Sequence, residues 1–208
     1  MRYRKIPDES VRRLPMYLRG LQFFSEQRVE RVSSQKLAGL VGVNSPQIRK
    51  DLSYFGDFGI PGVGYDTVKL LKHIRSILRL TTPCKTALVG FGNLGSALIK
   101  YPGFEAYGLH ISDIFDIDRR KVGKMVKNIR VQDISKLSSL KKKQVRLAII
   151  AVPAAAAQEI TDRLIKTGVN GILNFAPYYL NVPKKVKVIS IDIAMDLATL
   201  PYYLPTGS

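Results

Sequence analysis

The sequence has few of the residues that most often carry out chemistry or hold a small fold together. It contains one cysteine, Cys84, and two histidines, His73 and His110. A single cysteine excludes a disulfide framework within the chain and favours a reducing, cytoplasmic setting. Cys84 stands just before an apolar run, so we expect it to pack as a small buried hydrophobic residue.

Long apolar runs are missing as well. No stretch of the sequence approaches the roughly 20 residues of a membrane-spanning helix. The basic residues at the start of the chain are not followed by the apolar core of a signal peptide. We therefore expect a soluble intracellular protein with no membrane partner.

Acidic residues are scarce relative to basic ones. The 208 residues include 33 Lys and Arg against 16 Asp and Glu, which gives a formal net charge of +17. Such an excess favours a polyanionic partner, usually nucleic acid and sometimes an anionic membrane surface. A general bias towards Lys and Arg for solubility or heat resistance is the alternative. Residues 1–82 have 15 basic and 7 acidic groups and residues 83–208 have 18 and 9, so this division does not locate the surface.

The first 80 residues show the apolar spacing of short helices. Apolar side chains recur every three or four positions over residues 11–25, and Pro15 is expected near the start of this helix, where a proline costs least. Ser33 and Ser34 offer an N-cap for a second helix, which should end near Gly42.

A third helix is predicted to start at Asn44 or Ser45, because either residue can cap it and Pro46 suits its first turn. The stretch 55–65 is rich in glycine and aromatic residues, which favours a tight turn or hairpin. Residues 68–80 return to helical spacing. This order is typical of a winged helix-turn-helix, so we assign residues 1–80 to a DNA-binding domain of that kind.

The pattern changes at residues 81–83. Beyond them, apolar strands predicted at 86–89, 109–115, 145–152, 171–175 and 186–189 alternate with helices. Strands that are apolar throughout predict a parallel sheet covered by helices on both faces, as in a Rossmann-type α/β domain. We assign residues 84–190 to this domain and residues 191–208 to a C-terminal helix. The run Lys141-Lys142-Lys143 is expected to form a solvated loop.

A glycine-rich turn follows the first of these strands. Its sequence is Gly90-Phe91-Gly92-Asn93-Leu94-Gly95. It opens a helix, which is the context that a dinucleotide-binding turn requires. Gly90 permits the tight turn, Gly92 lets backbone amides approach a pyrophosphate, and Gly95 allows close packing of helix and strand. A turn that only packs is the alternative.

Carboxylates end the second strand. Asp116, or in second place Asp118, can accept hydrogen bonds from both hydroxyls of an adenine ribose and would repel a 2′-phosphate. This favours NAD over NADP, although Arg119 or Arg120 could accommodate the phosphate. A coenzyme A or nucleotide ligand is a further alternative.

The sequence offers no chemistry to accompany this site. A dehydrogenase needs a group that moves a proton as the hydride moves, but His73 precedes the boundary and His110 begins a strand. No His, Cys and carboxylate residues have the spacing of a metal site, and no second domain is large enough to close over a substrate. We expect a regulator and not an enzyme; a dehydrogenase with a basic appendage is the alternative.

Polar residues of the third predicted helix suit DNA recognition. Ile48 and Leu52 would face the core and leave donors for base edges and phosphates exposed. These donors are Gln47, Arg49, Lys50, Ser53 and Tyr54. A solvated helix face is the alternative, and the net charge of +17 favours DNA.

Together these segments resemble the Rex family of bacterial redox-sensing transcriptional repressors, over nearly the whole chain. The similarity is carried by Arg49-Lys50-Asp51-Leu52-Ser53-Tyr54-Phe55-Gly56, Gly62-Val63-Gly64-Tyr65, the glycine-rich turn, Tyr101-Pro102-Gly103, Gly171-Ile172-Leu173-Asn174-Phe175-Ala176-Pro177 and Leu200-Pro201-Tyr202-Tyr203-Leu204. The resemblance implies a homodimer that binds operator DNA when free or carrying NAD⁺. It would release the DNA when NADH binds, and so sense the NADH/NAD⁺ ratio.

The resemblance also implies roles for individual residues. The C-terminal helix would be swapped into the partner subunit, where Asp192 pairs with Tyr101 beside the nicotinamide in one state and with Arg19 in the other. Here Ser190-Ile191-Asp192 stands in place of the family's more typical Asn-Val-Asp. The nicotinamide end would be lined by Val152, Pro153, Asn174, Phe175, Ala176 and Pro177. On the DNA side, Ser45, Gly62 and Gly64 would join the donors of the third helix.

Overall fold

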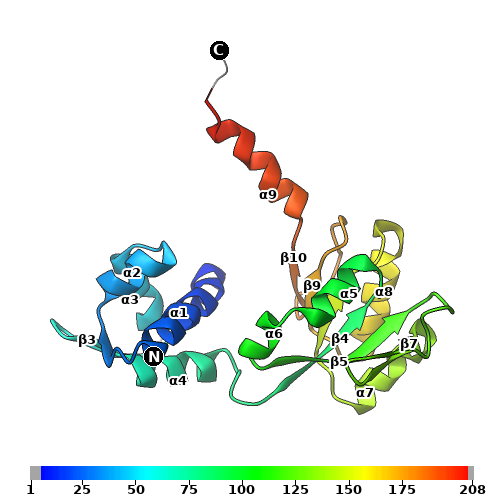
Figure 1. The fold of residues 1–208 in the computed structure, drawn as a ribbon, viewed down its shortest axis with the longest axis horizontal. Coiled ribbons are helices and arrows are strands. Elements are labelled where there is room, and N and C mark those ends of the chain that lie inside the picture. The colour runs from blue at the N-terminus through cyan, green and yellow to red at the C-terminus, as the bar shows by residue number, and fades with distance from the viewer. Residues whose placement is uncertain (1–5, 206–208) are drawn as a thin grey trace. The chain divides into compact units, whose positions relative to one another are not determined.

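The structure of the chain is a computed structural model that describes residues 6–205. It divides into two compact units, of which unit 1 ends at Thr82 and unit 2 begins at Pro83 (Figure 1). No helix in the described part is long and apolar enough to cross a membrane. Each unit buries apolar side chains of its own.

Unit 1 combines helices with a small sheet of strand order β1-β3-β2. Its elements are α1 (Asp8–Glu26), β1 (Arg31–Val32), α2 (Ser34–Val41), α3 (Ser45–Ser53), β2 (Gly59–Ile60), β3 (Gly64–Asp66) and α4 (Thr67–Ile77). β3 pairs antiparallel with both β1 and β2. Since the β2–β3 hairpin follows α2 and α3, the unit has the arrangement of a winged helix-turn-helix.

Capping residues fix the starts of α2 and α3. The Ser33 hydroxyl accepts a hydrogen bond from the Lys36 amide at 3.1 Å, and the Asn44 side chain accepts one from the Gln47 amide at 2.9 Å. α2 ends at Gly42, whose φ of 69° suits a residue without a Cβ. The predicted starts of both helices and the predicted end of α2 are confirmed.

Two features of unit 1 differ from the prediction. α1 begins at Asp8, so Pro15 lies in the helix interior and not near its start. The additional turn holds Asp8 and Glu9, whose charges favour a helix N-terminus but leave no apolar pattern to detect. β1 was missed because its two residues are too few to show an alternation.

Unit 2 is built around a seven-stranded sheet of order β10-β9-β8-β4-β5-β7-β6. Its elements are β4 (Cys84–Val89), α5 (Asn93–Lys100), α6 (Gly103–Ala106), β5 (Leu109–Asp116), β6 (Met125–Val126), β7 (Ile129–Asp133), the 3₁₀ helix η1 (Ile134–Ser138), α7 (Ser139–Lys142), β8 (Leu147–Ile150), α8 (Ala154–Lys166), β9 (Gly171–Asn174), β10 (Lys187–Ser190), α9 (Ile193–Thr199) and the 3₁₀ helix η2 (Leu200–Tyr203). The five predicted strands pair in parallel. Two strands were not predicted: β7 extends the sheet in parallel, and β6 pairs with β7 antiparallel.

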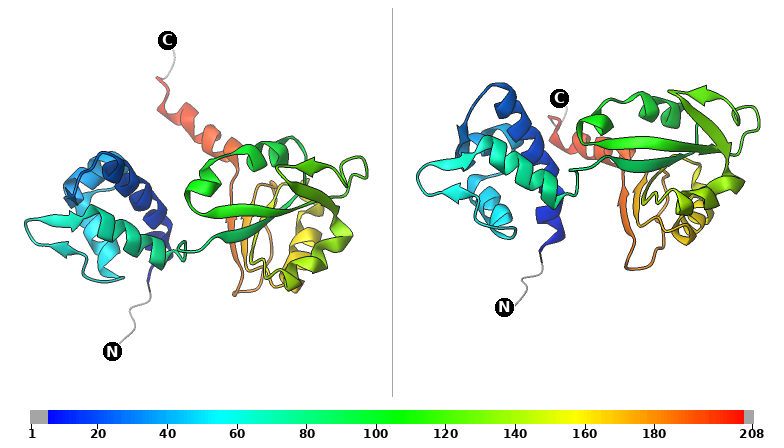
Figure 2. Two further views of the ribbon diagram at one scale, coloured as in Figure 1. Left: turned by 60° about the horizontal axis from the view of Figure 1, so that its bottom comes forward. Right: turned by 90° about the horizontal axis from the view of Figure 1, so that it is seen from below.

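Helices cover both faces of this sheet. Ala87 and Val89 of β4 belong to a core cluster completed by α8, η1 and α7, whereas Leu88 between them belongs to a second cluster with Ile99 of α5. The alternation follows from the two-residue repeat of a strand. Figure 2 shows helices on either side of the sheet in two further views. The predicted α/β fold class, with a winged helix before a Rossmann-type sheet, is confirmed.

The Lys141-Lys142-Lys143 run does not form the solvated loop that was expected. Lys141 and Lys142 end α7, and the Lys143 ammonium pairs with the carboxylate of Asp113, which is 1% exposed. The pairing is needed because a buried carboxylate without a partner costs several kcal/mol or titrates instead. Cys84 is half-buried, and burial raises the pKa of its thiol.

Candidate functional sites

The loops that carry the predicted ligand residues meet at one edge of the sheet in unit 2. They follow the carboxyl ends of β4, β5, β8 and β9, which lie parallel and side by side. The chain passes from β4 to β5 on one side and later returns to β8 on the other, so the strand order reverses beside β4. In open α/β sheets, ligands bind in the crevice at such a reversal.

The fold requires glycine at two of the three glycine positions in the 90–95 turn. Gly90 has a φ of 97°, and a Cβ on it would lie 2.3 Å from the Ala151 carbonyl oxygen. A Cβ on Gly95 would lie 2.0 Å from the Gly90 carbonyl oxygen. Gly92 has neither constraint, since its backbone is extended and a Cβ would meet nothing within 4 Å. Packing within the chain therefore requires glycine at 90 and 95 but not at 92.

Asp116 fastens this turn to the end of β5. Its Oδ2 accepts a hydrogen bond from the Phe91 amide at 2.7 Å and lies 3.2 Å from the Lys121 ammonium. Its Oδ1 accepts a bond from the Asp118 amide at 2.8 Å. A carboxylate can accept about four hydrogen bonds, so Asp116 can hold the turn and still accept bonds from a ligand.

Asp118 is the more accessible of the two carboxylates. Its Oδ1 and Oδ2 bind the Arg120 guanidinium in a bidentate pair at 3.0 and 2.9 Å. The Arg120 side chain and amide lower the pKa of Asp118 to about 2. Because the Arg120 side chain is 89% exposed, water and salt screen the pair, and the arginine can exchange it for another anion at little cost.

Asn174, at the end of β9, binds its own loop. It is 0% exposed, and its amide nitrogen donates to the carbonyl oxygens of Ala176 and Tyr178 and to the Ser190 hydroxyl. Its amide oxygen accepts the Ala176 backbone amide at 3.0 Å. This burial leaves the Asn174 side chain little surface for a direct contact, so its place at the nicotinamide end stays a prediction. Asn174 instead shapes the loop that carries Phe175 and the exposed Pro177.

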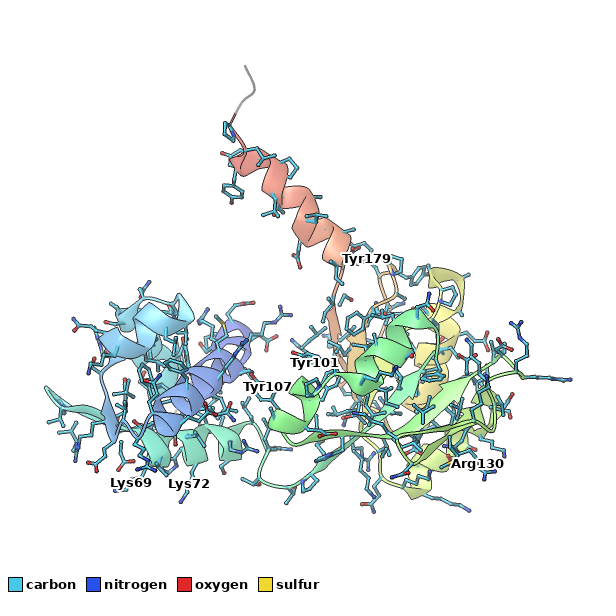
Figure 3. All side chains as sticks on the ribbon, viewed as in Figure 1. Lys69, Lys72, Tyr101, Tyr107, Arg130 and Tyr179 are labelled. Atoms are coloured by element: carbon cyan, nitrogen blue, oxygen red, sulfur yellow. The ribbon has the colours of Figure 1, made fainter. Side chains whose placement is uncertain are left out.

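Tyr101 stands at the carboxyl end of α5 and is 58% exposed. Its ring meets Phe104 edge-on, with ring centroids 5.4 Å apart. A Cβ on Gly103 would lie 2.3 Å from the Tyr101 ring, so glycine at 103 permits this ring position. Figure 3 shows Tyr101 beside α5 and α6. Val152 and Pro153, which follow β8, are half-buried and exposed, respectively.

Asp192 forms the N-cap of α9, where its Oδ1 accepts the amides of Ala194 and Met195 at 3.0 and 3.2 Å. No residue of α9 or η2 is buried. The large apolar side chains exposed here are Ile193, Met195, Leu197, Leu200, Tyr202, Tyr203 and Leu204. Exposed apolar side chains gathered in one segment favour an interaction site. Arg19 is exposed on α1 in unit 1.

Asp51 organises unit 1, a role that the sequence did not reveal. Its carboxylate is 0% exposed and accepts hydrogen bonds from Ser10, Arg13 and Tyr17 of α1. Gln47, one turn earlier in α3, donates to it at 2.7 Å. These bonds fix α3 against α1, and they turn the Gln47 amide towards Asp51. The signal was the i, i+3, i+7 spacing of the α1 donors, which places them on one face of the helix.

The same network sets the ionisation of Asp51. Burial by itself would raise the pKa of Asp51, but the hydrogen bonds from Arg13, Tyr17, Gln47 and Ser10 outweigh it and hold the pKa at about 2. The hydrogen bond to Asp51 also raises the pKa of Arg13, and burial raises that of Tyr17. At neutral pH the network is therefore an ion pair joined by a neutral tyrosine.

Arg49 lies where the starts of two helices meet. Its Nη1 donates to the Ser34 hydroxyl at 3.0 Å and to the Ser45 hydroxyl at 2.9 Å. These serines begin α2 and α3, whose first turns carry free amides that favour anions. The remaining predicted donors of α3 are exposed or half-buried: Lys50, Ser53 and Tyr54.

The β2–β3 hairpin forms the wing. At its tip, Gly62 has a φ of 76° with open space around it. Gly64 has a φ of 98°, and a Cβ on it would lie 2.6 Å from the Val32 carbonyl oxygen, so pairing with β1 requires glycine there. Between the wing and α3 lies a hollow of about 560 Å³, lined in part by Arg49 and Ser53.

Within residues 6–205 there is no group of three His, Cys, Asp or Glu residues that could hold a metal ion. His73 of α4 lies against Phe58, with ring centroids 5.1 Å apart. His110 is exposed at the amino end of β5, opposite the edge where the ligand loops meet.

Comparison with known families agrees with this division into units. Residues 81–178 match the family described as CoA binding domain, and residues 5–53 match the family described as putative DNA-binding protein N-terminus. A winged helix joined to a Rossmann-type sheet defines the class: a transcription regulator that responds to a small ligand.

Similar proteins narrow this class. The chain is 47% identical over 199 residues to the redox-sensing transcriptional repressor Rex of Roseiflexus sp. (strain RS-1), which covers 95% of this chain and 90% of that protein. A crystal structure of RSP with β-NAD⁺ and operator DNA superposes with a TM-score of 0.89 at 34% identity, covering 96% of this chain and 93% of that one. RSP with β-NADH gives 0.85 at 32% identity, covering 96% and 94%. The chain belongs to the Rex family of redox-sensing transcriptional repressors, whose members are regulators and not enzymes.

Proposed function

We propose that this protein is a repressor that binds operator DNA, releases it when NADH binds, and thereby senses the NADH/NAD⁺ ratio in the cytoplasm. The proposal rests on the family and on the solved complexes of RSP with operator DNA, NAD⁺ and NADH. Release by NADH requires that NADH binds the DNA-free state of the protein more tightly than the DNA-bound state. NAD⁺ must lack this preference.

The single observation that carries the choice of ligand is Gly92. Neither backbone conformation nor packing within the chain requires glycine at this position. An anion that approaches the turn would require it, because a Cβ would keep the pyrophosphate away from the backbone amides at the start of α5. This end of the cofactor is common to NAD⁺ and NADH, so the turn selects the class of ligand and not its redox state.

The other loops at this edge complete the site. Asp116 positions the turn and Asp118 stands beside it, and both can bind the adenine ribose. At the other end, the backbone of the loop held by Asn174 would line the nicotinamide pocket. Side chains near the nicotinamide would be Tyr101, Val152, Pro153, Phe175, Ala176 and Pro177.

DNA recognition is assigned to α3 and the wing. Arg49, held by Ser34 and Ser45 at two helix starts, would bind a backbone phosphate and set the register of α3 in the major groove. Lys50, Ser53 and Tyr54 would face the duplex with Gln47 beside them. The glycine at position 62 would let the wing approach the DNA closely, since a Cβ there would meet nothing within the chain and would point into the space the DNA needs.

The protein acts as a homodimer in this proposal, in which α9 and η2 of each chain pack on the partner. Support comes from the exposed apolar side chains of these two elements, which find no burial within their own chain. The switch then uses Asp192, which pairs with Tyr101 in one state and with Arg19 in the other. Both bonds that cap α9 are accepted by Oδ1 of Asp192, and its second oxygen suits such an exchange.

A gel shift with full-length protein and an operator duplex tests the function. NAD⁺, NADH, NADPH and coenzyme A are titrated in separately, the last because residues 81–178 match a CoA binding domain. NADH alone should release the DNA, and release by coenzyme A or by none of the four contradicts the proposal. The Asp192→Ala variant should keep operator binding and lose release by NADH; unchanged release would remove Asp192 from the switch.

Substitution of the turn glycines tests the ligand site. Gly92→Ala should lower NADH affinity at least tenfold and leave the melting temperature unchanged, because the added Cβ meets only the ligand. Gly95→Ala is the contrasting control, since its Cβ meets the Gly90 carbonyl oxygen and should destabilise unit 2. Normal NADH affinity in Gly92→Ala would show that the pyrophosphate lies elsewhere.

A further inference from the structure

The positive charge of unit 2 comes from one segment. Residues 119–146 contain 11 Lys and Arg against one acidic residue, whereas residues 83–118 and 147–208 together contain 7 basic and 8 acidic residues. The segment runs from the end of β5 through β6, β7, η1 and α7 to β8. It borders the β6–β7 edge of the sheet, where Figure 3 shows Arg130.

Most of these cations have no close ion-pair partner among residues 6–205, although Arg119 and Lys136 help to lower the pKa of Asp133. Four are engaged within the chain: Arg120 by Asp118, Lys121 by Asp116, Lys143 by Asp113 and Arg146 by the Gly168 carbonyl oxygen. The other seven are exposed, and in the described part of the chain no ion pair within 4.0 Å includes them. These seven form the basic edge: Arg119, Lys124, Lys127, Arg130, Lys136, Lys141 and Lys142. The one acid of the segment, Asp133, accepts the Ser135 amide at the start of η1.

The basic edge is not explained by stability. Heat-stabilising charges form networks of both signs, whereas these repel one another and lower the stability of the folded state. Lysines can also protect an exposed edge strand from pairing with other chains. That protection would need charge only at β6 and β7, yet Lys136, Lys141 and Lys142 lie on η1 and α7.

Lys127 is placed at a conformational cost. It occupies the two-residue turn between β6 and β7, where Lys127 and Asn128 have φ values of 46° and 64°. Asparagine and glycine suit such a turn, whereas a lysine in the left-handed region is strained because its Cβ crowds the following carbonyl oxygen. A charged side chain at a strained hairpin tip suggests that the charge serves binding to another molecule and not the stability of the fold.

We propose that the basic edge binds the phosphates of duplex DNA, in addition to the operator contacts of α3 and the wing. Residues 119–146 contain no aromatic residue on which the bases of a single strand could stack. Met125 is the one large exposed apolar side chain among them, which is too little for insertion into a membrane. An array of cations without stacking or apolar groups suits a sequence-independent phosphate surface.

The inference extends the proposed function but does not require the NADH switch, so the experiment separates the two. Full-length wild type and the triple variant Lys124→Gln/Lys127→Gln/Arg130→Gln are titrated with an operator duplex and with a duplex of unrelated sequence at several salt concentrations. The matched control Lys85→Gln/Lys184→Gln/Lys185→Gln removes the same charge from exposed lysines elsewhere in unit 2.

For the unrelated duplex, the triple variant should bind at least tenfold more weakly than the control. Its slope of log K against log salt should be shallower by about 0.9 for each lost phosphate contact. Lys127→Gly should weaken this binding as well, while the relieved turn leaves the melting temperature unchanged or higher. Equal slopes and affinities for variant and control overturn the inference even if operator release by NADH is normal. Loss of binding to phosphatidylserine vesicles, with binding to the unrelated duplex unchanged, also overturns it.

Discussion

Asp51 in unit 1 and Asn174 in unit 2 are both 0% exposed, and both belong to stretches that the sequence linked to ligand contact. Each binds its own chain instead. Asp51 receives bonds from side chains 34 to 41 positions earlier, on another helix. Asn174 mostly binds backbone groups two to four positions later, and reaches Ser190 on β10. The charged residue joins separate elements, whereas the neutral amide mainly shapes the loop that follows it.

Asp51 and Asn174 bind different kinds of partner for an energetic reason. A buried carboxylate needs a cation and several donors, which only another element can supply in sufficient number. An amide carries both donors and an acceptor, so it can satisfy a short loop by itself. The position of α3 therefore depends on an ion pair between helices, while the loop after β9 depends on local hydrogen bonds that do not titrate.

The largest expected effect is that of Asp51→Ala. It leaves the buried hydroxyls of Ser10 and Tyr17 without their acceptor and removes the partner of Arg13, which should cost about 3 to 5 kcal/mol of unfolding free energy. Urea unfolding followed separately in each unit would show the loss in unit 1, with operator affinity falling as α3 loosens. The exposed Asp57→Ala is the control; a loss below about 1 kcal/mol for Asp51→Ala would contradict the role given to this network.

Asn174→Ala should have a smaller effect, confined to unit 2. It leaves the buried backbone amide of Ala176 unsatisfied, at a cost of about 1 to 3 kcal/mol, while the Ala176 carbonyl oxygen keeps its bond from the Tyr178 amide. NADH affinity should fall because the loop loses its shape, while operator binding without ligand is kept. Asn181→Ala, an exposed change in the following loop, should alter neither quantity. Weakened operator binding by Asn174→Ala would show that the amide does more than shape the loop.

Low pH should destabilise unit 1 through Asp51, whereas Asn174 in unit 2 does not titrate. The pKa of Asp51 is lowered from 3.8 to about 2 in the folded protein, so its contribution is present above pH 4 and is lost as the pH falls towards 2. The loss should amount to about 2 kcal/mol in unit 1. Unfolding free energies measured at pH 6 and pH 2.5 should show it in the wild type but not in Asp51→Asn. An equal acid dependence in Asp51→Asn would place its origin elsewhere.

Ser190→Ala should have the smallest effect. Its hydroxyl makes the longest of the Asn174 bonds, at 3.3 Å, and Asn174 keeps its backbone partners without it. We expect a loss of about 0.5 kcal/mol and unchanged NADH affinity. A change in affinity similar to that of Asn174→Ala would mean that β10, and not the local loop, sets the geometry of the site.

Much of the fold could be predicted from local patterns. The apolar strands β4, β5 and β8 lie in the core of the sheet, so their sequences show it directly, and the caps Ser33 and Asn44 act within three residues. The strands β6 and β7 were missed because they lie at the sheet edge, where polar residues alternate with few apolar ones. α1 was predicted too short because its first turn is polar.

The site was predicted less completely, for two reasons. The partners of Asp51 and Asn174 are set by tertiary packing, so the sequence showed neither the network around Asp51 nor the loop contacts of Asn174. The basic edge was hidden by counting charge over residues 83–208 as a whole, because the excess in 119–146 is masked by the neutral remainder. A count in shorter windows would have located it.

The exposed apolar side chains of α9 and η2 also imply that the protein needs a minimum concentration to function. If these elements find burial only on a second chain, the stability of each sensing site depends on the concentration of the protein as well as on that of its ligand. Dilution would then separate the chains before either unit unfolds. A cell holding few copies would have no working sensor, whatever its NADH level.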